Sequence, residues 1–105
     1  MLGTALRLAG YEVSTAPDAV VALSVARQER PDLILLDLGL PGGGGMVVLE
    51  RLRGLMVTAI TPVIVISGND VTEQEILGAG AQCFLAKPVT ADKLVAAVAS
   101  FLSLE

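Results

Sequence analysis

The stretch Pro31–Asp37 reads PDLILLD, and it decides the fold class of the chain. Pro31 stops the helix that is expected before it, because proline cannot continue an α-helix. After Asp32 come four consecutive apolar residues, and a short apolar run between breaks is typical of a strand that is buried on both faces. The run ends on a carboxylate, Asp37. A strand covered on both faces indicates a parallel sheet with helices on either side.

Two further apolar runs have the same form. Pro62–Ser67 reads PVIVIS and Cys83–Pro88 reads CFLAKP, and the apolar part of each ends at a polar residue, Ser67 in one and Lys87 in the other. Tyr11–Ala16 (YEVSTA) alternates between apolar and polar residues and is predicted to be another strand. Together with the first stretch, the sequence therefore predicts four strands.

Helical patterns lie before, between and after these strands. Asp18 has the residue type of a helix N-cap, and Thr72 with Glu75 has the spacing of a capping box. The expected helices span residues 2–9, 18–29, 46–55, 72–80 and 90–102. This alternation predicts an α/β fold, a doubly wound parallel sheet with right-handed crossovers and helices on both faces.

Composition narrows the classes of function. The chain has 105 residues, which predicts one domain over residues 1–105, and its net charge of −4 argues against binding to nucleic acid or to an anionic membrane. No histidine is present, which excludes histidine-ligated metals and serine–histidine catalysis, and the lone Cys83 excludes an internal disulfide. No apolar run reaches the roughly 20 residues of a membrane span, and the N-terminus lacks the pattern of a signal peptide. A cytoplasmic location is the expectation.

The polar residues that end three of the predicted strands are the candidate site. Asp37, Ser67 and Lys87 would meet at the carboxyl edge of the sheet, where open α/β sheets bind their ligands. A carboxylate, a hydroxyl and an ammonium group suit acyl-phosphate chemistry, with the carboxylate as nucleophile and the ammonium group as a partner for the developing charge. The alternative is that these residues only mark where buried strands reach water.

These stretches, together with Leu40-Pro41 and Gly45, with Gly78–Ala81 and with Phe84–Pro88, resemble the response-regulator receiver domains of two-component signalling. The resemblance covers the whole chain, in order. It implies a flavodoxin-like fold and a signalling module that is not an enzyme. It also implies phosphoryl transfer from a histidine kinase or phosphotransfer protein, followed by a conformational switch.

The same resemblance assigns roles to single residues. Asp37 matches the phosphoacceptor, Ser67 the switch hydroxyl and Lys87 the residue that contacts the phosphoryl group. Phe84 matches the aromatic residue that rotates during switching, and its alternative is a plain core phenylalanine. Two further positions, Gly39 and Asn69, match sites that tune the lifetime of the phosphoryl group. The Lys87-Pro88 peptide matches one that is usually cis in the family.

The resemblance breaks at the beginning of the chain. Family members start with a strand that ends in two acidic residues, and these two residues bind Mg²⁺. This sequence starts inside the first helix, so the family's first strand and acidic pair are missing. Of the family's metal ligands only Asp37 and the backbone carbonyl of Gly39 remain, and two protein oxygens are few for Mg²⁺.

A receiver without its first strand would leave the centre of the sheet open. The neighbouring strands must then close the gap, a second chain must fill it, or the natural chain starts earlier and supplies the strand itself. For the sequence as it stands we expect a homodimer. The alternative function is a pseudo-receiver, an interaction or dimerisation module that works without phosphate. A small-molecule binder is a third possibility, which the failure of residues 42–45 to fit a phosphate-binding glycine loop disfavours.

Overall fold

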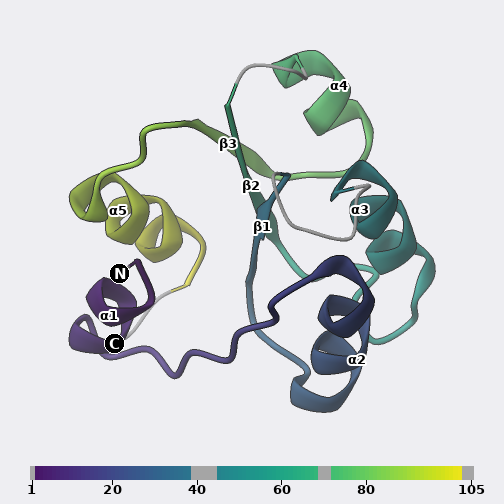
Figure 1. Ribbon diagram of the computed structural model, residues 1–105, viewed down its shortest axis with the longest axis horizontal. Coiled ribbons are helices and arrows are strands. Elements are labelled where there is room, and N and C mark those ends of the chain that lie inside the picture. Colours follow the sequence, from purple (N-terminus) through teal and green to yellow (C-terminus); the bar gives the residue numbers. More distant parts are fainter. Residues whose placement is uncertain (1, 39–44, 69–71, 103–105) are drawn as a thin grey trace.

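The structure is a computed structural model that describes residues 2–38, 45–68 and 72–102 (Figure 1). The described elements alternate along the chain as the sequence predicts, with one exception given below. They are α1 (Leu2–Leu8), α2 (Ala19–Glu29), β1 (Ile34–Asp37), α3 (Gly45–Gly54), β2 (Val63–Ser67), α4 (Glu73–Gly78), β3 (Cys83–Ala86) and α5 (Ala91–Phe101).

The sheet that these residues form is parallel, with strand order β1-β2-β3. Ile34 pairs with Val63 at one end of the β1–β2 ladder, and Ser67 pairs with Ala86 at one end of the β2–β3 ladder. The central strand β2 is buried along its whole length. This burial explains why its sequence is a continuous apolar run and not an alternating one.

Helices cover both faces of the sheet, with α1 and α5 on one side and α2, α3 and α4 on the other (Figure 1). Side chains of β2 point to the two faces in turn. Val63 and Val65 belong to the core under α2, α3 and α4, and Ile64 and Ile66 belong to the core under α1 and α5. The predicted doubly wound α/β architecture is confirmed for the described residues.

The predicted helix starts are also confirmed. The carboxylate of Asp18 accepts from the backbone N–H of Val21, and Thr90 caps α5 in the same way through Lys93. At the start of α4 the capping box is complete: the Thr72 hydroxyl accepts from the N–H of Glu75, and the Glu75 carboxylate accepts from the N–H of Thr72. Each side chain satisfies a backbone group that the first turn leaves without a helical partner.

The predicted strand Tyr11–Ala16 is wrong. These residues form no regular secondary structure and are absent from the sheet, so β1 is an edge strand within the described residues. Contacts with α1 hold the segment: the N–H of Tyr11 donates to Leu6 O at 3.1 Å, and the Arg7 guanidinium donates to Val13 O at 3.4 Å. A strand forms only when its backbone hydrogen-bonds to a neighbouring strand, and residues 11–16 do not pair with β1.

Hydrogen bonds from Arg53 connect the end of α3 to the backbone before β2 and β3. From the end of α3 its guanidinium donates to Thr58 O at 3.0 Å, to Thr61 O at 2.9 Å and to Gly80 O at 2.9 Å. It also donates to the side-chain oxygen of Gln82 at 2.7 Å, which in turn accepts from the N–H of Val63 at the start of β2. Burial lowers the pKa of Arg53 from its usual value, but an arginine keeps its charge in proteins.

Candidate functional site

The three predicted site residues come to one edge of the sheet because their strands are parallel and in register. Asp37 is the last residue of β1, Ser67 is the last residue of β2, and Lys87 directly follows β3. Two hydrogen bonds continue the ladders past these ends: the N–H of Leu38 donates to Ile66 O at 3.0 Å, and the N–H of Lys87 donates to Ser67 O at 2.9 Å. The backbones of the three strand ends are therefore fixed to one another.

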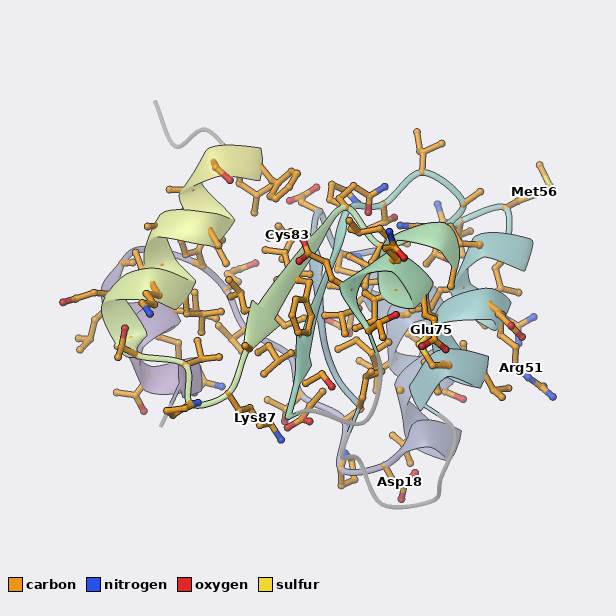
Figure 2. The ribbon with its side chains drawn as sticks, turned by 90° about the horizontal axis from the view of Figure 1, so that it is seen from above. Asp18, Arg51, Met56, Glu75, Cys83 and Lys87 are labelled. Atoms are coloured by element: carbon orange, nitrogen blue, oxygen red, sulfur yellow. The ribbon has the colours of Figure 1, made fainter. Side chains whose placement is uncertain are left out.

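Asp37 and Lys87 form an ion pair across this edge, with 2.9 Å between Lys87 Nζ and Asp37 Oδ1. Figure 2 shows Lys87 extending from the end of β3. The side chains of Lys87 and Asp37 are 43% and 45% exposed, respectively, so water screens the pair. Such a contact places the two opposite charges next to each other, but it is weak enough for either group to change its partner.

Ser67 and Phe84 lie deeper. Ser67 is only 3% exposed, and it is the last residue of the buried strand β2, beside the edge that carries Asp37 and Lys87. Phe84, on β3, is partly buried and packs against the core that contains Val65 and Ile76. This position fits a core phenylalanine as well as a switching one. The Lys87-Pro88 peptide is cis, as the sequence predicts.

A hollow of about 480 Å³ opens beside the ion pair. Besides Asp37 and Lys87 it is lined by Ile66, Pro88 and Val89. The sequence assigned no site role to Ile66 or Val89, and it singled out Pro88 only for its cis peptide bond, although each lies within two positions of a predicted site residue. The edge thus combines a charged pair with an apolar wall. Gly39 and Asn69, which the sequence assigns to phosphoryl lifetime, lie outside the described residues.

The described residues do not make a magnesium site. Three or more His, Cys, Asp or Glu side chains in metal-binding proximity occur nowhere within residues 2–38, 45–68 and 72–102. Asp37 is the carboxylate at this edge, and one of its oxygens already contacts Lys87. Mg²⁺ is octahedral and keeps several waters, but a single carboxylate that is already paired with Lys87 would leave almost all of its coordination to water. The side chains that the structure describes at this edge therefore do not fit a bound Mg²⁺.

A parallel sheet with helices on both faces and a charged pair at its carboxyl edge places the chain among the doubly wound α/β domains, which bind their ligands at this edge. Comparison with known families makes this specific. The family model of the response regulator receiver domain matches residues 1–99, and the chain belongs to this family. It is a receiver domain of two-component signalling, and receiver domains are signalling modules and not enzymes.

Curated relatives and solved structures of receiver domains are also similar to this chain. The transcriptional regulatory protein PrrA of Mycobacterium tuberculosis is 39% identical over 99 residues, which are 92% of this chain and 42% of PrrA. The response regulator PleD of Caulobacter vibrioides is 41% identical over 92 residues, 86% of this chain and 20% of PleD. The chain thus spans less than half the length of these curated relatives.

Among solved structures, the receiver domain of NtrX from Brucella abortus has a TM-score of 0.86 and 30% identity, and the match covers 99% of this chain and 88% of that one. The receiver domain of a sensor histidine kinase from Pseudomonas aeruginosa has a TM-score of 0.84 and 27% identity, with 95% and 84% covered. That structure holds a magnesium ion in its active-site cleft. Within the described part of our chain, no helix is long and apolar enough to cross a membrane.

Proposed function

We propose that Asp37 accepts a phosphoryl group from a histidine kinase or a phosphotransfer protein in the cytoplasm, and that the chain then changes conformation. The observation that carries this proposal is the ion pair of 2.9 Å between Asp37 and Lys87 at the carboxyl edge of three parallel strands. A half-exposed carboxylate is accessible to a donor protein, and a flexible ammonium group beside it can follow the negative charge as it moves.

The transfer conserves atoms and charge in a simple way. An oxygen of the Asp37 carboxylate attacks the phosphorus of a phosphohistidine, the P–N bond breaks, and its electron pair returns to the imidazole of the donor. The product is an acyl phosphate on Asp37. In this proposal Lys87 moves from the carboxylate oxygen to an oxygen of the new phosphoryl group, with little cost because the original pair is half exposed.

The switch follows from the position of Ser67. Its hydroxyl is buried in the unmodified chain, at 3% exposure, and in the proposal it turns outward to donate a hydrogen bond to a phosphoryl oxygen. This movement frees space next to β3, where Phe84 packs. Phe84 then turns inward. Gly39 and Asn69 stay predictions for the lifetime of the phosphoryl group.

The test is covalent labelling of Asp37. The chain is incubated with acetyl phosphate, and intact mass spectrometry followed by reductive trapping of the acyl phosphate locates the phosphoryl group. Because the described residues make no magnesium site, we expect acetyl phosphate to label the chain only weakly. The label should be absent from Asp37→Asn and retained, with a changed lifetime, in Ser67→Ala. Labelling that persists in Asp37→Asn, or no labelling under any donor including a histidine kinase, contradicts the proposal.

A second candidate function is a pseudo-receiver that acts through interaction alone. Two observations favour it: the described residues bring no metal-binding cluster to the site, and within the same residues β1 has a neighbour on one side only. We propose that the edge of β1 that is open within the described residues is covered by a second copy of the chain in a homodimer. Edge strands with unpaired backbone groups are common places of association, and identical chains associate most simply with two-fold symmetry.

A further inference from the structure

Gly45, the first residue of α3, makes an unusually close backbone contact. A β-carbon placed on Gly45 would lie 2.8 Å from the Cα of Leu38, 2.7 Å from its Cδ2 and 3.3 Å from its carbonyl oxygen. Real β-carbons almost never approach other heavy atoms to less than 3.0 Å. Only glycine fits without displacing something, and Leu38 is the residue that directly follows Asp37.

Leu38 holds the end of β1 in place. Its N–H donates to Ile66 O at 3.0 Å, one position beyond the last residue of β1. Asp37 is the register partner of Ile66, so this hydrogen bond fixes the backbone directly after Asp37 to the same residue. The position of the Asp37 carboxylate relative to Lys87 therefore depends on where Leu38 lies.

A side chain at position 45 would move Leu38 and not α3. The helix is anchored by Val48, Leu49 and Leu52, which are 3%, 0% and 2% exposed, and by the hydrogen bonds of Arg53 at its other end. Leu38 is only partly buried, and its backbone is retained by the hydrogen bond to Ile66 O. The clash involves the Cα of Leu38, so a change of rotamer cannot relieve it.

We propose that Gly45 is a positioning residue for Asp37: its missing β-carbon allows the contact with Leu38 that fixes the end of β1. The expected effect of a substitution at Gly45 on phosphoryl transfer rests on the proposed function, whereas its expected effect on the backbone does not. The first effect is a change in the reactivity of Asp37, and the second is a local loosening of the Leu38–Ile66 hydrogen bond.

The experiment compares Gly45→Ala with Gly54→Ala. Both glycines are end residues of α3, but a β-carbon at Gly54 meets nothing within 4 Å. Amide hydrogen exchange by NMR measures the Leu38 N–H against the Val65 N–H, which reports on the core. In Gly45→Ala we expect exchange at Leu38 to speed by about tenfold or more relative to Val65, and in Gly54→Ala we expect no such difference.

The functional arm is the rate at which acetyl phosphate labels Asp37. We expect Gly45→Ala to lower this rate by about 10-fold to 100-fold, as displacements near 1 Å do in other sites, and Gly54→Ala to leave it unchanged. If the unsubstituted chain takes no label from acetyl phosphate or from a histidine kinase, the proposed function fails, and the exchange experiment alone decides on Gly45.

Two results would overturn the inference. One is equal acceleration at Leu38 and Val65, or failure of Gly45→Ala to fold, because either would show that the contact supports the whole domain and not the site. The other comes from the double variant Leu38→Ala with Gly45→Ala, which removes the contact to Cδ2 but keeps the contact to Cα. Recovery of normal exchange at position 38 in this variant would mean that a side-chain clash, and not the backbone approach, causes the effect.

Discussion

Replacement of Arg53 by methionine should destabilise the fold far more than the loss of an exposed charge on the same helix. The substitution removes donors to three backbone carbonyls, at Thr58, Thr61 and Gly80, and to Gln82, at 2.7 to 3.0 Å. Each hydrogen bond from a charged donor is worth roughly 1.5–3 kcal/mol net. The burial that lowers the pKa of Arg53, and the ordering of its long side chain, offset part of the sum.

We therefore expect a loss of about 2–4 kcal/mol, a large share of the 5–15 kcal/mol that is typical of a domain. Urea denaturation followed by circular dichroism measures it, and the melting temperature should fall by roughly 10–20 °C. The matched control is Arg51→Met in the same helix, because Arg51 is exposed and points away from the sheet in Figure 2. A difference between the two variants below about 1 kcal/mol would refute the assignment of Arg53 as the residue that connects α3 to the backbone before β2 and β3.

Four further outcomes are expected. Magnesium should add little to the labelling rate of Asp37 by acetyl phosphate, because one carboxylate is a poor magnesium site, and a strong dependence on the metal would show that other residues complete the site. Light scattering over a concentration series should find a dimer that persists in Asp37→Ala, whereas a cooperatively folding monomer at high micromolar concentration would eliminate the dimer. Thr72→Ala should cost about 1 kcal/mol in urea denaturation through loss of the capping box, with no effect on labelling. Lys87→Met should change stability by only about 0–1 kcal/mol while it slows labelling, since the ion pair is half exposed.

Much of this structure could be predicted from local sequence. The runs that end at Asp37, Ser67 and Lys87 are strands, and their parallel register brings two of these side chains into contact. A short continuous apolar run that ends at a polar residue is enough to predict these strands, because few other structures produce such a run. The N-caps at Asp18 and Thr72 were also predictable, since each acts on residues next to it in the chain.

The failures have a common physical cause. Tyr11–Ala16 has the alternation of a strand, but a strand forms only against a neighbour, and alternation does not report whether a neighbour exists. Arg53 also escaped prediction, because most of its partners are backbone carbonyls, which no residue type reveals, and because Gly80 and Gln82 lie 27 and 29 positions along the chain. Gly45 was recognised as part of a family pattern, but its contact with Leu38 needs coordinates.

The two ends of the sheet are held by different kinds of interaction, and this difference suits a switch. At the amino-terminal ends of β2 and β3, Arg53 donates to several part-buried oxygens, and such a network cannot rearrange without leaving polar groups unpaired. At the carboxyl edge, the contact between Asp37 and Lys87 is half exposed and can be exchanged at small cost. A new charge at Asp37 would therefore change the carboxyl edge while the opposite end keeps the fold.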